Sequence, residues 1–171
     1  NWLEDIVRRD RLDHFARFML AYYTDTTDDF YGLLYSNPSQ TCLDIAFNLL
    51  DAGLKDEAFA LLHGLEHAKV WQDWTLPMST MAHYTLASID PAHKFKPNPF
   101  VDVFPYRLEE IDVLKAAIAD NPTDFTAHYL LGCILYDKLF YAEAAAEWRK
   151  TIELNPDFYI SYRNLAVADY S

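Results

Sequence analysis

Two histidines and a glutamate near the middle of the chain have the spacing of a zinc-binding motif. His63, Glu66 and His67 form the pattern H-x-x-E-H, which occurs in one class of metallopeptidases. On a helix the two histidines lie one turn apart on the same face, so both imidazoles could bind one metal ion while Glu66 acts as a base. A zinc-dependent hydrolase is therefore one of the two functions that we consider.

Several features of the same segment argue against a metal. It coincides with the end of a helix whose core-facing stripe includes Leu62 and Leu65, and Gly64 weakens a helix that would have to hold ligands rigidly. No third ligand can be identified from the sequence. Because short motifs often match by coincidence, we expect no metal and no other cofactor.

The other residues that could take part in catalysis give equally weak evidence for it. His83 and His128 occupy equivalent positions of a repeat, which predicts a packing role for both, and His93 is expected in solvent. Glu109 and Glu110 are adjacent, so on a helix they point about 100° apart and cannot share one site. We expect one of them between helices and the other in solvent. No phosphate-binding glycine loop or nucleophile elbow occurs, so we predict that the chain is not an enzyme.

A repeat of helix pairs accounts for the chain better than catalysis does. Asn121-Pro122 and Asn155-Pro156 lie 34 residues apart, and a period of this size indicates a repeat architecture. Apolar residues recur at three- and four-residue steps over 125–138 and again over 141–154, which predicts two helices with a short link between them. Gly132 lies on the first stripe and has no side chain, so a neighbouring helix can approach closely there. A further helix is predicted over 158–170.

The same pattern divides the whole chain into units of unequal regularity. We predict a degenerate unit at about 1–38, a regular unit at 39–72, a unit with an insertion at 80–122, the clearest unit at 125–158 and a half unit at 159–171. In the first unit, helices are expected over 2–9, 14–23 and 30–35. Four prolines interrupt residues 89–105, and the helix that follows is predicted from about Tyr106 to Asp120, with Pro105 in its first turn. The predicted fold is a single all-α domain of about nine or ten helices.

Composition limits the classes of partner. The 171 residues are 51% hydrophobic, enough for a sizeable core, and the net charge of −12 disfavours nucleic acid and anionic lipid. Cys42 and Cys133 lack metal spacing and are expected to be reduced, and no signal peptide or membrane-spanning run is seen. We therefore expect a cytoplasmic protein. The chain begins at Asn1 and ends after an unpaired helix, so we expect it to be part of a longer protein.

Residues 125–158 resemble the tetratricopeptide repeat (TPR) family. The resemblance depends on Leu131, Gly132, Ala144, Trp148 and Pro156, with Trp148 in place of the usual phenylalanine. It implies a right-handed superhelical stack of antiparallel helix pairs. A second set of motifs resembles the TPR section of large bacterial proteins that carry an N-terminal β-rich domain of unknown function: residues 12–18, 104–110, 121–122 and 128–132. Both resemblances imply an interaction scaffold.

The TPR resemblance also implies which residues would face a bound peptide. Its inward positions correspond to Thr126, Tyr129, Cys133 and Tyr136 in the clearest unit, with Tyr84 and Arg163 among those of the neighbouring units. Such a surface is aromatic with one positive charge, which suits an apolar or aromatic peptide. It lacks the lysine and asparagine of the family's clamp for chaperone tails, so we predict no binding of acidic chaperone C-termini.

The sequence thus favours a noncatalytic protein-protein interaction scaffold with a tyrosine-rich concave face. This face would dock a peptide or brace another domain of the parent protein. A third role for the same tyrosines, packing against a next repeat that is missing from this chain, remains open. Tyr162 and Leu165 on the last helix could also mediate self-association, because that helix lacks its partner. The alternative function is the zinc-dependent hydrolase that uses His63, Glu66 and His67.

Overall fold

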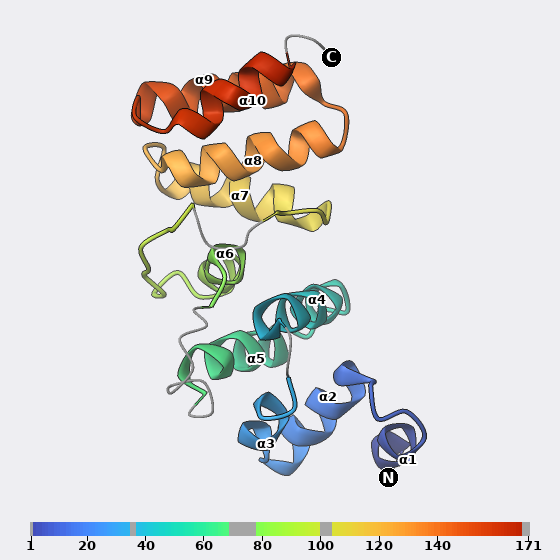
Figure 1. Cartoon of the computed structure of the whole chain (residues 1–171). Coiled ribbons are helices and arrows are strands. Elements are labelled where there is room, and N and C mark those ends of the chain that lie inside the picture. The colour runs from blue at the N-terminus through green and yellow to red at the C-terminus, as the bar shows by residue number, and fades with distance from the viewer. Residues whose placement is uncertain (1, 35–36, 69–77, 100–103, 169–171) are drawn as a thin grey trace. The chain divides into compact units, whose positions relative to one another are not determined.

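The chain is all-α, as the sequence predicts. The computed structural model describes residues 2–34, 37–68, 78–99 and 104–168, and these contain ten helices and no strand (Figure 1). The helices are α1 (Trp2–Arg9), α2 (His14–Thr24), α3 (Thr27–Tyr31), α4 (Pro38–Asp51), α5 (Lys55–His67), α6 (Thr80–Ile89), α7 (Glu109–Asp120), α8 (Phe125–Asp137), α9 (Tyr141–Leu154) and α10 (Tyr159–Ala168).

Contacts group the helices into two compact units. The first unit, Asn1–Asp90, contains α1 to α6, and the second, Pro91–Ser171, contains α7 to α10. In the first unit α4 packs along α5, and in the second α8 packs along α9. Each pair is joined by only three residues, so its helices run antiparallel. The pairs occupy residues 38–67 and 125–154, where the sequence predicts units at 39–72 and 125–158.

The apolar stripes of the clearest pair are buried as the periodicity requires. Along α8 the buried side chains include Ala127, Leu130 and Ile134, which share one face at three- and four-residue steps. On α9 the small Ala144 and the bulky Trp148 are buried one turn apart. The second unit continues the stack in both directions, because α7 packs against α8 and α10 packs against α9.

Three of the helix-to-helix turns contain one residue in the left-handed backbone region. These residues are Asp25, Gly53 and Leu139, with φ of 57°, 78° and 68°. Only glycine adopts this region without steric cost, and for other residues the cost is about 1–2 kcal/mol. Gly53 therefore suits the α4–α5 turn. Leu139 occupies the equivalent position in the α8–α9 turn, where its backbone is strained.

The same hydrogen bond closes all three turns. In each, the amide after the left-handed residue donates to the carbonyl five residues earlier, the 6→1 bond of the Schellman motif. The bonds are Thr26 to Ala21 (2.9 Å), Leu54 to Leu49 (2.8 Å) and Phe140 to Leu135 (2.9 Å). The α2–α3 pair is thus a helical hairpin of the same kind as α4–α5 and α8–α9.

Residues 14–31 form a hairpin with a shortened second helix. α3 has five residues, against thirteen in α5 and fourteen in α9. The sequence predicted this short helix over 30–35, but it begins at Thr27 and ends at Tyr31, because the Schellman turn at Asp25 starts the next helix immediately. Position 35 lies outside the described residues.

Gly132 lets Trp148 lie directly on the backbone of α8. A Cβ atom added to Gly132 would lie 2.6 Å from Trp148 Cδ1, far inside van der Waals contact. The indole Nε1–H donates to the carbonyl of Tyr129 at 3.3 Å, so the ring is both packed and hydrogen-bonded. The predicted close approach at Gly132 is therefore present in the α8–α9 pair.

Gly64 has the same role in the first unit. An added Cβ would lie 2.9 Å from the Tyr31 ring carbon Cζ, and the Tyr31 hydroxyl donates to the carbonyl of Leu61 at 2.8 Å. Tyr31 is 1% exposed, so its polar tip needs this acceptor. The glycine of the H-x-x-E-H segment is thus explained by packing.

α7 begins three residues later than the sequence predicted. The helix starts at Glu109, so Pro105 precedes it instead of forming its first turn. The cause is Glu110, whose buried carboxylate accepts hydrogen bonds from the amides of Tyr106 (2.6 Å) and Arg107 (2.7 Å). These bonds hold the preceding backbone in a turn. Glu109 instead pairs with Arg107 at 2.8 Å.

We expect Gly132→Ala to destabilise the second unit by about 1–3 kcal/mol, the cost of overpacking, despite the better helix propensity of alanine. The free energy of unfolding from urea titration measures this. In a Trp148→Phe background the smaller ring should relieve the overlap, so the same glycine substitution should cost clearly less. Equal costs in the two backgrounds would contradict the contact.

We expect Leu139→Gly to stabilise the chain by up to about 1 kcal/mol, because glycine removes the left-handed strain at an exposed position. Leu139→Ala is the matched control, since alanine also loses the side chain but keeps the strain. Thermal unfolding of both variants compares their stabilities, and we expect the glycine variant to be the more stable. An equal gain in stability with alanine would contradict the prediction.

Candidate functional site

The predicted peptide-binding residues divide into buried and accessible groups. Thr126 and Tyr129 are buried on α8, with Tyr129 only 7% exposed. Cys133 and Tyr136 are half-buried, and Arg163 on α10 is exposed. Tyr84 lies on α6 in the first unit and is buried as well. A ligand can therefore reach Cys133, Tyr136 and Arg163 without displacing core residues.

The burial of Tyr129 follows from the residue that leads into α10. Its ring meets Phe158 edge to face, with centroids 4.9 Å apart, and Phe158 is itself buried. This geometry is favourable for aromatic pairs. Tyr129 thus packs within its own unit, against the residue that precedes α10, which the sequence did not predict.

The accessible residues of α8 and α10 lie together. Asn164 Nδ2 on α10 is 4.0 Å from Cys133 Sγ on α8, which joins the two helices. Tyr136 packs beside Trp148, with ring centroids 5.5 Å apart. We call this surface the α8–α10 face: Cys133, Tyr136, Arg163, Asn164 and Val167.

The thiol on this face is not activated. Burial raises the pKa of Cys133 to about 11, although hydrogen bonds with Tyr129 and Trp148 and the charge of Arg163 act in the opposite direction. A neutral thiol is a weak nucleophile. Burial also raises the pKa of Tyr129. The chemistry available at this face is therefore contact and hydrogen bonding.

The two histidines of the H-x-x-E-H segment stack on each other. Their rings lie on α5 with centroids 4.4 Å apart and an interplanar angle of 25°. His67 Nδ1 lies 2.8 Å from the carbonyl oxygen of His63, so one of its two nitrogens is engaged by the backbone. Among the described residues, no group of three ligand-bearing side chains includes either histidine.

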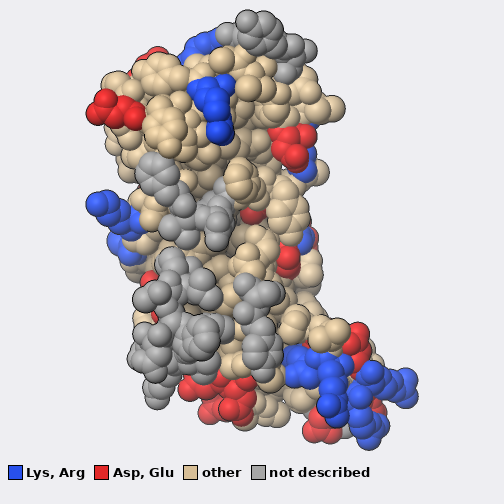
Figure 2. Space-filling model, viewed as in Figure 1, with Lys and Arg blue, Asp and Glu red and all other residues tan. Residues whose placement is uncertain are grey.

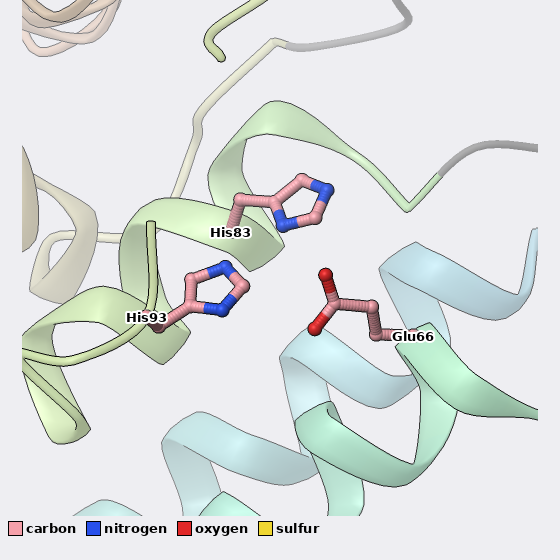
Figure 3. A group of neighbouring side chains, drawn as sticks. All are labelled: Glu66, His83 and His93. Atoms are coloured by element: carbon pink, nitrogen blue, oxygen red, sulfur yellow. The ribbon is translucent and has the colours of Figure 1, made fainter. Parts of the chain in front are cut away.

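Glu66 instead points toward another histidine of the first unit. Figure 3 shows its side chain on α5 directed toward His83 on α6. One ligand atom of Glu66 lies within 4.8 Å of a ring nitrogen of His83. Glu66 is exposed and His83 is half-buried, so this pair lies at the surface.

The sequence did not predict this pair. It predicts a packing role for His83 from its equivalence to His128, and it places His93 in solvent, whereas His93 is half-buried. For His128 the packing role holds, because it is buried and its Nδ1 lies 2.6 Å from Glu147 Oε2 on α9. No period in the sequence connects Glu66 with His83.

The surface charge is unevenly distributed. Acidic residues outnumber basic ones, 26 to 14, yet basic side chains gather over α1 on the face drawn in Figure 2. Arg8 and Arg9 lie in the last turn of α1, and Arg11 follows it. Net charge alone therefore does not describe this surface.

Within the described ranges, no helix has both the length and the apolar character needed to cross a bilayer.

Comparison with known proteins identifies no family. No family model matches the chain. Two solved structures, both described as crystal structures of MamA, are 23% identical to it and cover 93% of its length. The match spans 84% of one and 79% of the other, with TM-scores of 0.41 and 0.42. A likeness at this level does not assign a function to the chain.

We expect Cys133 to resist alkylation in the folded chain at pH 8, because its pKa of about 11 leaves little thiolate there. The rate with iodoacetamide should rise as the pH approaches 11 and should reach that of a free thiol at pH 8 after unfolding. Peptide mass mapping separates Cys133 from the buried Cys42. Rapid labelling of Cys133 in the folded chain at pH 8 would contradict the assignment.

Proposed function

We propose that the chain is a noncatalytic protein-interaction scaffold that docks a peptide on the α8–α10 face. The observation that carries this proposal is the accessibility of Tyr136, Arg163 and Val167, on the largely buried α8 and on α10, which packs against α9. Val167 is 51% exposed, and exposed apolar side chains beside a charge are typical of interaction surfaces.

The chemistry of the face points to one class of peptide. Tyr136 and Val167 offer apolar contact area, and Arg163 offers a planar donor for a carboxylate. A peptide that carries apolar side chains beside a single acidic group would satisfy all three. A polyanion would not, because the face holds one cation within a chain of net charge −12.

The same face suits an internal partner as well as an external one. A segment of the parent protein with this chemistry, outside the 171 residues, would dock in the same way, and the face would then brace another domain. Two free cysteines, one buried and one half-buried, support the cytoplasmic location that we propose with it.

The test is selection of peptides from a random library displayed on phage, followed by measurement of their affinity for the purified chain. We expect enriched peptides to combine apolar residues with an acidic one. Arg163→Glu should weaken their binding at least tenfold, because it replaces attraction by repulsion at the carboxylate.

Arg149→Glu is the matched control. Arg149 is also exposed, but it lies on α9 outside the α8–α10 face, and the substitution changes the net charge equally. It should leave affinity within about twofold. Circular dichroism confirms that both variants fold. An equal loss of peptide affinity in the two variants would rule out the α8–α10 face as the binding surface. So would selection of peptides that have neither the apolar residues nor the acidic one.

A further inference from the structure

We propose that a cavity between α1, α2 and α3 binds a small organic acid that carries one carboxylate on an apolar body. The cavity lies within the first unit and has a volume of about 260 Å³. α2 packs against both α1 and α3, and all three helices contribute side chains to the cavity wall (Figure 1). The site is separate from the α8–α10 face, so it does not depend on the proposed scaffold function.

The most deeply buried part of the cavity wall is apolar and fixed in shape. Ala21 of α2 and Phe30 of α3 line the cavity and are only 7% and 2% exposed. The Phe30 ring meets the buried Phe18 ring edge to face, with centroids 5.5 Å apart. This contact fixes the orientation of Phe30, so the cavity has a preformed apolar floor.

The rest of the apolar wall is partly uncovered because α3 is short. α3 ends after five residues, whereas α5 and α9 continue for thirteen and fourteen. Leu33, two residues beyond α3, lines the cavity and is exposed, while Val7 of α1 and Leu20 of α2 are half-buried. Apolar area on three sides of one cavity favours a ligand with an apolar body.

Arg17 of α2 brings a positive charge to the same cavity. Its side chain is half-buried, and its Nε–H is shielded from solvent without a hydrogen-bond partner among the described residues. A guanidinium that has lost part of its hydration interacts more strongly with an anion than one in water does. Its planar fork of donors also matches the two oxygens of a carboxylate. We therefore assign the acid group of the ligand to Arg17.

The rim of the cavity limits the ligand to one negative charge. Glu4 of α1 and Asp29 of α3 line the cavity and are exposed, so they repel a second anionic group. The Thr24 hydroxyl donates to the carbonyl of Leu20 at 2.8 Å and lies 2.9 Å from the Thr26 hydroxyl, so the rim threonines already bond to each other. Phosphates and dicarboxylates are thereby disfavoured, and a monocarboxylate fits.

Phenylacetate is the probe that tests the site, because it joins one carboxylate to an apolar ring. It has about ten non-hydrogen atoms, for which a dissociation constant of about 0.1–5 mM is reasonable. Titration of the ¹⁵N-labelled 171-residue chain, followed by amide chemical shifts, should show saturable changes in α1 to α3. 2-Phenylacetamide has the same shape without the charge and should bind at least about fivefold more weakly.

Two variants separate the charge from the apolar wall. Arg17→Gln should remove the preference for phenylacetate over phenylacetamide, because the charge that distinguishes them is lost. Leu33→Ala changes a residue outside any helix and leaves Arg17 in place, so it should weaken both compounds by the same factor of about two or more. Arg8→Gln is the matched control: Arg8 lies on α1 beside Asp5, outside the cavity, and its loss changes the net charge equally. It should leave both affinities within about twofold, and circular dichroism checks that each variant folds.

Three results would overturn the proposal. One is the absence of saturable shifts in α1 to α3 of the folded wild-type chain at high millimolar phenylacetate. Another is equal binding of phenylacetate and phenylacetamide by the wild type, which would exclude a role for the carboxylate. The third is tighter binding of 2-phenylethylamine than of phenylacetate, because Glu4 and Asp29 would then outweigh Arg17 and make this a cation site.

Discussion

In each of the two units, an aromatic side chain packs directly against a glycine within a helix, and this contact holds the helices together. In the first unit Tyr31 lies on Gly64, and in the second Trp148 lies on Gly132. In both, the polar tip of the ring donates to the carbonyl three residues before the glycine, at Leu61 or Tyr129. A glycine within a helix costs about 1 kcal/mol, and burial of a large ring with its donor satisfied more than offsets that cost.

This contact also determines which residues remain accessible. Side chains two positions apart on a helix point about 200° apart, so Gly64 facing Tyr31 directs Glu66 to the opposite side of α5. Figure 3 shows that side facing His83. On α8, Trp148 and Phe158 cover Gly132 and Tyr129, and the residues left half-exposed are Cys133 and Tyr136. The packing that stabilises the hairpins therefore determines which side of α5 carries Glu66 and which residues of α8 stay accessible.

The parts of the fold that depend on local periodicity were predictable, and those that depend on single side chains were not. α1 and α9 have the predicted bounds, because an apolar stripe ends where the helix ends. The predicted start of α7 was wrong, because one buried carboxylate, Glu110, accepts from the amides of Tyr106 and Arg107 and holds that backbone in a turn. The peptide-facing positions came from the TPR resemblance, which does not say that Phe158 buries Tyr129. The grouping of Glu66 with His83 joins elements that no sequence period connects.

His83 and His128 show how one repeat position can acquire two roles. His128 lies beside Glu147, a carboxylate from the second helix of its own hairpin. The carboxylate near His83 is Glu66, on α5 of the first unit. Two histidines at positions that the sequence predicts to be equivalent therefore lie beside carboxylates from different elements. The repeat pattern places the histidines, but it does not determine which carboxylate lies beside each of them.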